Sequence, residues 1–210
     1  MKRCIIISGG PELNREVLLQ NSQAEDVFII CADHGYDHAK ALGIQPHLLL
    51  GDFDSMQAVR QGVGMETLVY PCEKDDTDTV AAVKEALRRG FELVELHGCT
   101  GGRLDHYLGN VACLLYLHHR GAKGILYAPW GTAQIVEGTH VLTHMQGRTV
   151  SILPAEGSAQ GVTLTGFHYP LHEATLTAEY PVGISNVVEE EQAVIRVREG
   201  ALLLILNDKI

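Results

Sequence analysis

Short apolar segments alternate with helical patterns through the first 129 residues, and this alternation constrains the fold more than any other feature of the sequence. The apolar segments are rich in aliphatic and β-branched residues and have the length of buried strands. They lie at residues 4–8, 27–32, 48–50, 67–70, 93–97 and 124–127, with helical patterns at residues 35–42, 78–90 and 104–120. The alternation predicts an α/β fold, with a mostly parallel sheet and helices on both of its faces.

The pattern changes after Pro129, where no convincing amphipathic helix follows. Strand-like segments instead recur at intervals of roughly 8–12 residues. They lie at residues 134–137, 141–143, 149–153, 161–165, 174–177, 185–188, 193–197 and 201–206. This spacing is typical of a β-sandwich or barrel. We therefore predict an α/β domain over residues 1–129 and an all-β sandwich domain over residues 130–210.

The charge balance narrows the classes of partner. The chain has 16 Lys and Arg against 26 Asp and Glu, a net charge of −10, which argues against the broad basic face of a protein that binds nucleic acid or an anionic membrane. No stretch approaches the roughly 20 apolar residues of a membrane span, and the apolar run after Met1 is too short for a signal peptide. The five cysteines form no Cys-x-x-Cys pair, so we expect reduced thiols and a cytoplasmic protein.

Turn motifs follow the predicted strands directly. The segments are 8–10, 33–35, 51–55, 73–78 and 98–103; four of them begin where an apolar run ends, and 73–78 begins after two intervening residues. In a parallel sheet these turns emerge at one edge, and ligands of open α/β sheets bind outside the carboxyl ends of the strands. A single shared site at that edge is therefore expected.

Short carboxylates are concentrated in these turns. Asp52 and Asp54 are separated by one residue and could both reach a hard cation such as Mg²⁺, which takes one or two protein carboxylates. The alternative is a turn that uses aspartates only to cap a helix. The same two interpretations apply to Asp75, Asp76 and Asp78, where Thr77 or Asp78 could cap the following helix, although three acids in four residues exceed what a cap needs.

A glycine-rich turn, residues 98–106, runs into the predicted helix at 104–120. Such a turn allows backbone N–H groups to approach an anion at a helix N-terminus, and the guanidinium of Arg103 suits phosphate. The segment matches neither GxxxxGK[ST] nor GxGxxG, so a tight connection from strand to helix is an open alternative. Carboxylates for a cation and a turn for phosphate on the same edge together favour chemistry on a magnesium nucleotide.

These motifs resemble the thiamine pyrophosphokinase (thiamine diphosphokinase) family. The matching segments are 32–35, 51–55, 74–78, 98–106 with Asn110, 166–171 and 183–186, and their order and spacing agree over nearly the whole chain. The resemblance implies a Mg²⁺-dependent homodimer that transfers pyrophosphate from ATP to the hydroxyl of thiamine, giving thiamine diphosphate and AMP. It also implies that the site lies between the subunits.

The resemblance also implies roles for individual residues. Asp52, Asp54 and Asp78 would be the metal ligands and, with Arg103 and Asp105, the catalytic residues. ATP would be bound by Asp33, Gly35, Asp75, Thr100, Gly101, Gly102, Arg103 and His106, and thiamine by Tyr169, Ser185 and Asn186. One departure from the family pattern falls at His34, which replaces a small residue, and we expect it to affect local geometry and nucleotide preference.

Two other functions are compatible with the same residues. A metal-dependent phosphoesterase would use the aspartates to activate water and would release phosphate without thiamine. A non-catalytic regulator would bind nucleotide or thiamine without turnover, with its aspartates only capping helices.

Overall fold

The computed structural model of the chain describes residues 1–51, 65–69 and 75–208. The chain divides into two compact units, Met1–Pro129 and Trp130–Ile210. No helix within the described ranges is long and apolar enough to cross a membrane.

The N-terminal unit is built on a parallel sheet with the strand order β6-β5-β1-β2-β3-β4. The strands are β1 (Arg3–Ile7), β2 (Val27–Ala32), β3 (Leu48–Gly51), β4 (Glu66–Val69), β5 (Leu93–His97) and β6 (Lys123–Ala128). The central strand β1 is buried along almost its whole length and pairs with β2 on one side and β5 on the other. Strands this apolar need cover on both faces.

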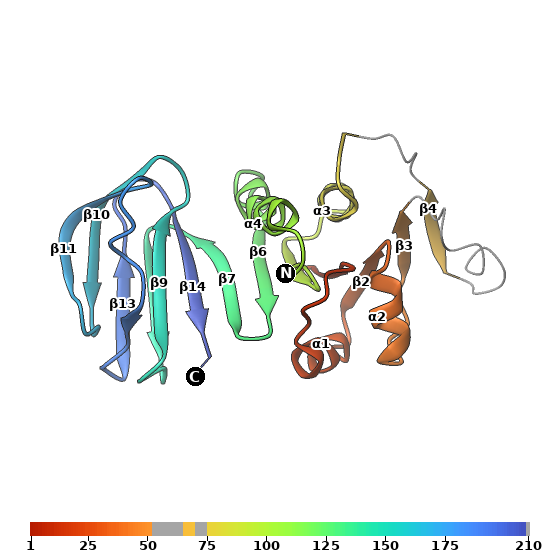
Figure 1. Cartoon of the computed structure of the whole chain (residues 1–210), viewed down its shortest axis with the longest axis horizontal. Helices are drawn as coiled ribbons and strands as arrows, with labels where there is room; N and C mark the ends of the chain where they lie inside the picture. The colour runs from red at the N-terminus through yellow and green to blue at the C-terminus, as the bar shows by residue number, and fades with distance from the viewer. Residues whose placement is uncertain (52–64, 70–74, 209–210) are drawn as a thin grey trace. The chain divides into compact units, whose positions relative to one another are not determined.

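Helices supply that cover, with α1 (Arg15–Ser22) and α2 (Gly35–Ala41) on one side of the sheet and α3 (Asp78–Arg88) and α4 (Leu104–His118) on the other (Figure 1). Leu18 of α1 and Ala39 of α2 pack in one apolar cluster with Ile5, Ile29 and other sheet residues. The predicted α/β fold, with helices on both faces, is therefore confirmed.

Helix α1 was not among the predicted helices. Its sequence, REVLLQNS, buries only Leu18, so it has no apolar stripe with a period of 3.6 residues. Asn14 begins the helix by accepting a hydrogen bond from the N–H of Val17 at 3.1 Å.

At α3 the sequence left two candidate N-cap residues, Thr77 and Asp78. The structure shows that Thr77 is the cap, since its hydroxyl accepts from the N–H of Val80. Asp78 is the first residue of α3, not its cap.

The C-terminal unit contains two antiparallel sheets. One has the order β12-β9-β14-β7 and the other β11-β10-β13-β8. The strands are β7 (Gly131–Val136), β8 (Thr139–Thr143), β9 (Thr149–Pro154), β10 (Ser158–Thr165), β11 (Leu171–Thr177), β12 (Asn186–Val187), β13 (Gln192–Arg196) and β14 (Leu202–Asn207). Alternate residues of both sheets, such as Val162, Ile195 and Leu204, form one core. This arrangement is the predicted sandwich.

Candidate active site

A cavity of ≈ 350 Å³ lies where the strands of the N-terminal unit end. Its lining comes from the turns after β1, β2 and β5 and from the first residues of α3 and α4; the lining residues are Ser8, Gly9, Gly10, Pro11, Ala32, Asp33, His34, Thr77, Asp78, Thr79, Gly98, Cys99, Gly101, Gly102, Arg103, His106 and Asn110. Turns that are far apart in the sequence thus share one site, as the parallel sheet predicts.

Two of the predicted acids, Asp33 and Asp78, line this cavity. Asp33 directly follows β2, and its backbone lies in the left-handed region at φ 47°, a conformation that is uncommon for any residue but glycine and is often found at functional sites. The N–H of Asp33 donates to the carbonyl of Leu50 at 2.8 Å, which holds this turn against the end of β3. The neighbouring acids lie elsewhere: Asp75 is exposed and outside the cavity lining, and Asp76 accepts from Nζ of Lys84 at 2.6 and 2.8 Å.

Asp52 and Asp54 lie outside the described residues. Among the residues that are described, no group of three or more His, Cys, Asp and Glu is arranged to hold a metal ion. The described donors are nevertheless of the right kind for Mg²⁺, because Asp33 and Asp78 supply carboxylate oxygens to a cavity that is also lined by hydroxyls. Gly51, the last residue of β3, lies close to Asp33, since a Cβ on Gly51 would be 3.3 Å from the Cα of Asp33.

The turn after β5 has the geometry of an anion cradle. Gly101 and Gly102 both have left-handed backbones, at φ 78° and 70°. Within the described part of the chain, the N–H groups of Gly101, Gly102 and Arg103 have no acceptor, so they are available to an anion at the start of α4. Thr100 is buried beneath the turn, with its hydroxyl 3.5 Å from the carbonyl of Glu12.

Gly35 contributes to the site through packing. It is the first residue of α2 and is buried, and a Cβ at this position would lie 1.8 Å from the carbonyl oxygen of Ile7. No other residue type could therefore bring α2 this close to the end of β1. Gly35 is absent from the residues that line the cavity.

Arg103 lines the cavity and forms an exposed ion pair with Asp105. Its Nε and Nη2 donate to the carboxylate at 3.1 and 2.5 Å, and the N–H of His106 donates to the same carboxylate at 2.9 Å. The hydrogen bonds from Arg103 lower the pKa of Asp105 to about 2. Because both side chains are mostly exposed, the pair contributes little stability and Arg103 can exchange Asp105 for a phosphate. His106 lines the cavity, whereas Asp105 does not.

The structure adds cavity residues that were not among the predicted site residues. Ser8 and Thr79 are buried, and their hydroxyl oxygens lie 2.9 Å apart. Cys99 lies beside them, and burial raises the pKa of its thiol to about 12, so this thiol stays protonated. Asn110 ties α4 to the turn by donating from Nδ2 to the carbonyl of Cys99 at 2.9 Å. The sequence carried a signal for three of them, since Ser8 and Cys99 lie in turns that follow predicted strands and Asn110 accompanies a family-matching segment.

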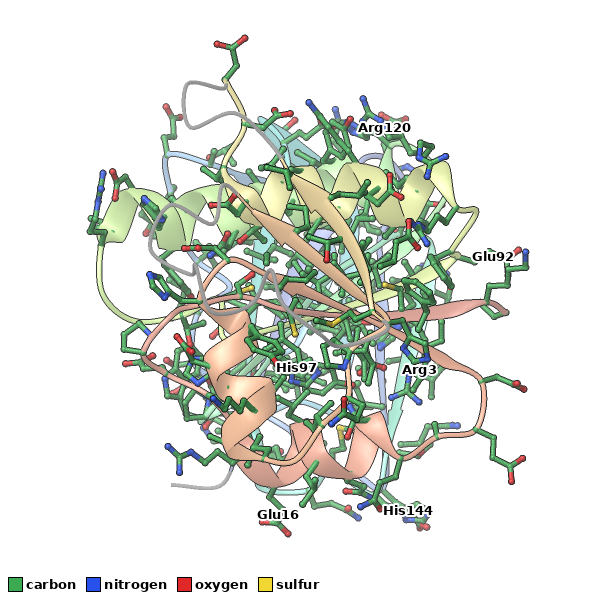
Figure 2. The ribbon with its side chains drawn as sticks, turned by 90° about the vertical axis from the view of Figure 1, so that its right-hand side faces the viewer. Arg3, Glu16, Glu92, His97, Arg120 and His144 are labelled. Carbon is green, nitrogen blue, oxygen red and sulfur yellow. The ribbon has the colours of Figure 1, made fainter. Side chains whose placement is uncertain are left out.

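A buried charged cluster supports β5, the strand that leads into the glycine turn. Glu95 accepts from Nε of Arg3 at 2.7 Å and from Nδ2 of Asn21 at 2.9 Å, and Nε2 of His97 lies 3.4 Å from the same carboxylate. His97 is fully buried and stacks on Tyr127, while Glu92, which directly precedes the strand, projects outward (Figure 2). Burial by itself would raise the pKa of Glu95, but the hydrogen bonds from His97 and Arg3 outweigh it and hold that pKa below its usual value.

The predicted thiamine contacts lie in the C-terminal unit. Asn186 is buried, and its side chain holds the backbone of Tyr169, accepting from its N–H at 2.9 Å and donating to its carbonyl at 2.7 Å. Tyr169 itself is 62% exposed and meets the ring of His168 edge to face. Ser185 is exposed and has a left-handed backbone at φ 60°, with its N–H donating to the hydroxyl of Ser151 at 3.0 Å. Asn186 therefore fixes the backbone of Tyr169, from which the exposed ring projects.

Comparison with known proteins identifies the family. The family model "Thiamin pyrophosphokinase, catalytic domain" matches residues 19–126, and "Thiamin pyrophosphokinase, vitamin B1 binding domain" matches residues 139–202. The chain is 29% identical to thiamine pyrophosphokinase of Bacillus subtilis, over 98% of both chains.

Solved structures agree with this result. The crystal structure of the Bacillus subtilis thiamine pyrophosphokinase matches with a TM-score of 0.85 and 26% identity over 100% of both chains. That of a thiamin pyrophosphokinase from Geobacillus thermodenitrificans matches with a TM-score of 0.83 and 29% identity, over 98% of this chain and 97% of the other. Since the catalytic-domain model alone spans more than half of the sequence, the chain belongs to the thiamin pyrophosphokinase family and is an enzyme.

Proposed function

We propose that the protein transfers the β,γ-pyrophosphoryl group of ATP to the hydroxyl of thiamine, giving thiamine diphosphate and AMP, with Mg²⁺ held by Asp52, Asp54 and Asp78. One observation carries the proposal. In a chain of this family, one cavity is lined by Asp33 and Asp78, by the turn whose N–H groups have no acceptor among the described residues, and by Arg103. A site with both anionic and cationic walls suits a nucleotide that carries a divalent cation.

The reaction exchanges one phosphorus–oxygen bond for another. The thiamine oxygen forms a bond to the β-phosphorus while the bond from that phosphorus to the oxygen bridging the α-phosphorus breaks, and AMP leaves with the electron pair. The N–H groups of the glycine turn and the guanidinium of Arg103 would hold the phosphates in line. Asp33 lines the cavity and is not one of the proposed metal ligands, so it could accept the proton of the hydroxyl. Mg²⁺ would supply neutralisation of the charge that develops on the phosphates.

For thiamine we propose a contact with the exposed ring of Tyr169 and with the turn at Ser185 and Asn186. The thiazolium ring carries a permanent positive charge, which an aromatic face attracts. We further propose a homodimer in which these residues of one subunit complete the site of the other. Sedimentation of the purified enzyme tests the dimer, since a monomer at assay concentrations would contradict it.

The test of the reaction is a nucleotide assay with and without thiamine, in saturating Mg²⁺. We expect AMP to form only when thiamine is present. The Asp78→Asn variant should lower AMP formation on the order of 10²-fold or more, as the loss of a charge-stabilising group does. Asp76→Asn is the matched control, because Asp76 is two residues away and pairs with Lys84 outside the cavity lining. It should keep AMP formation within about threefold of the wild type.

Other results of the same assay would contradict the proposal. ADP in place of AMP would indicate transfer of a single phosphoryl group. Phosphate release without thiamine would indicate the phosphoesterase, and binding without turnover that persists in a chelator would indicate the regulator. An Asp52→Asn variant with wild-type AMP formation would remove Asp52 from the proposed metal ligands.

A further inference from the structure

The turns after β1 and β5 form adjoining walls of the cavity and are joined to each other along their backbones. The N–H of Ser8 donates to the carbonyl of His97 at 2.8 Å, that of Gly10 to Gly98 at 2.7 Å, and that of Glu12 to Thr100 at 3.3 Å. The contacts of Ser8 and Gly10 thus extend the pairing of β1 with β5 beyond the strand ends, and an antiparallel bridge between Glu12 and Thr100 joins the two turns further on.

Glycines allow these walls to approach more closely than side chains would permit. A Cβ on Gly10 would lie 2.5 Å from the carbonyl oxygen of Gly98, and a Cβ on Gly98 would lie 2.3 Å from that of Ser8. Because Gly10 and Gly98 have no side chains, side-chain packing cannot fix the conformation of these walls. Their shape therefore depends on hydrogen bonds to the backbone, because glycine has the widest conformational freedom of any residue.

His38 supplies such a bond from outside the cavity. It lies on α2, and its Nε2 is 2.9 Å from the carbonyl oxygen of Gly10. A carbonyl only accepts, so Nε2 carries the proton and donates. The ring also adjoins the second wall, since a Cβ on Gly98 would be 3.6 Å from Cδ2 of His38. The backbone of Gly10 is thus held on both sides, through its N–H by Gly98 and through its carbonyl by His38.

We infer that His38 is a positioning residue for nucleotide binding, which fixes the Gly9-Gly10 turn in the shape that receives ATP. His38 is absent from the residues that line the cavity, so it acts through the turn and not on the ligand. A turn that is already ordered spares the nucleotide the entropic cost of ordering it. The identity of the nucleotide rests on the proposed function, whereas the fixing of the turn does not.

The experiment compares the full-length wild type with His38→Ala, His38→Gln and a control, His47→Ala. The amide of Gln can donate to the carbonyl of Gly10 as the imidazole does. His47 is a matched control because its Nδ1 accepts from the N–H of Ile29 at 3.1 Å, so it also binds backbone, but it directly precedes β3, at the opposite end of the sheet. Two quantities are measured: the hydrogen exchange rate of the Gly10 amide by NMR, and KM for ATP together with kcat for AMP formation.

Loss of one neutral hydrogen bond corresponds to about a tenfold change. We expect His38→Ala to speed exchange of the Gly10 amide about tenfold and to raise KM for ATP about tenfold, with kcat within about threefold of the wild type. His38→Gln should restore both quantities, and His47→Ala should change neither. The inference is overturned if exchange at Gly10 does not change in His38→Ala, if His38→Gln behaves as His38→Ala does, or if His47→Ala has the same effects.

Failure of the proposed function would be seen separately. A wild type that forms no AMP from ATP and thiamine would contradict the proposed reaction, and exchange at Gly10 would still decide whether His38 holds the turn. Conversely, an active wild type whose Gly10 amide exchanges equally fast in all variants would leave the reaction standing and remove the role of His38.

Discussion

Replacing Glu95 by Gln tests the buried charged cluster beneath the glycine turn. The substitution keeps the size of the side chain, so it opens no cavity, but it removes the charge and turns one acceptor into a donor. Glu95 now accepts from the guanidinium of Arg3 and from the amide of Asn21. A glutamine can accept from only one of them with its oxygen, and its NH₂ group then faces the other donor.

The expected loss of unfolding free energy follows from the burial of the Glu95 and Arg3 charges. The side chain of Glu95 is 3% exposed and that of Arg3 is 25% exposed. Breaking a buried ion pair costs about 3–5 kcal/mol, because one charge is left without a partner. Water reaches part of the Arg3 side chain and offsets some of this cost, so we expect the lower end of the range, about 3 kcal/mol.

The change in the free energy of unfolding caused by Glu95→Gln is measured by urea unfolding at 25 °C and pH 7, combined with hydrogen exchange of amides in β1 and β5. The control is Glu92→Gln, three residues earlier, where the carboxylate is 61% exposed and accepts from the N–H of Lys2. We expect this control to change the free energy of unfolding by less than about 0.5 kcal/mol. The reasoning fails if Glu95→Gln costs under about 1 kcal/mol, or no more than Glu92→Gln does.

Three further predictions concern the same unit. Burial lowers the pKa of His97, so the unfolded chain binds a proton that the folded chain does not. The free energy of unfolding of the wild type should therefore fall as the pH drops below about 6.5, by up to about 1.4 kcal/mol per pH unit from this one group. Urea unfolding of a His97→Gln variant should lack this contribution. Thr77→Ala should lower the free energy of unfolding by about 1 kcal/mol and Thr77→Ser by much less, because the serine hydroxyl can still cap α3. Gly35→Ala should give no soluble folded protein, since the added Cβ would lie 1.8 Å from the Ile7 oxygen, whereas Gly43→Ala, with nothing within 4 Å, should fold and lose only about 1 kcal/mol through its positive φ.

The strands and most helices could be predicted because each carries a pattern that burial imposes. β2 and β3 are unbroken apolar runs because both of their faces are covered, and α3 combines a cap at Thr77 with an apolar face. α1 gave no such signal. Leu18 is its one buried residue, and Asn14 caps its start. Asn21 also binds Glu95, which lies 74 positions later in the sequence. Local patterns hold no information on a contact of that kind.

The candidate site was predictable to the extent that strand ends determine it. Asp33, Gly101 and Arg103 line one cavity because parallel strands deliver their turns to one edge of the sheet. The hydroxyl pair of Ser8 and Thr79 could not be predicted, because it joins a strand end to a helix 71 residues later. The contact exists only through the crossing of β1 and α3, which no spacing in the sequence reports.

The acids from Asp75 to Asp78 illustrate why nearness in the sequence is a weak guide to a site. Asp75 is exposed outside the cavity lining, Asp76 binds Lys84 on α3, and Asp78, which Thr77 places in the first turn of the helix, lines the cavity. Asp75 and Asp76 lie in the bend before the helix and Asp78 in its first turn, so the three carboxylates do not share one helix face. Asp33 shares the cavity with Asp78 although 45 positions separate them, because each stands where a turn reaches the same edge of the sheet. The order of the strands, more than the number of acids in any segment, therefore decides which carboxylates can act on one ligand.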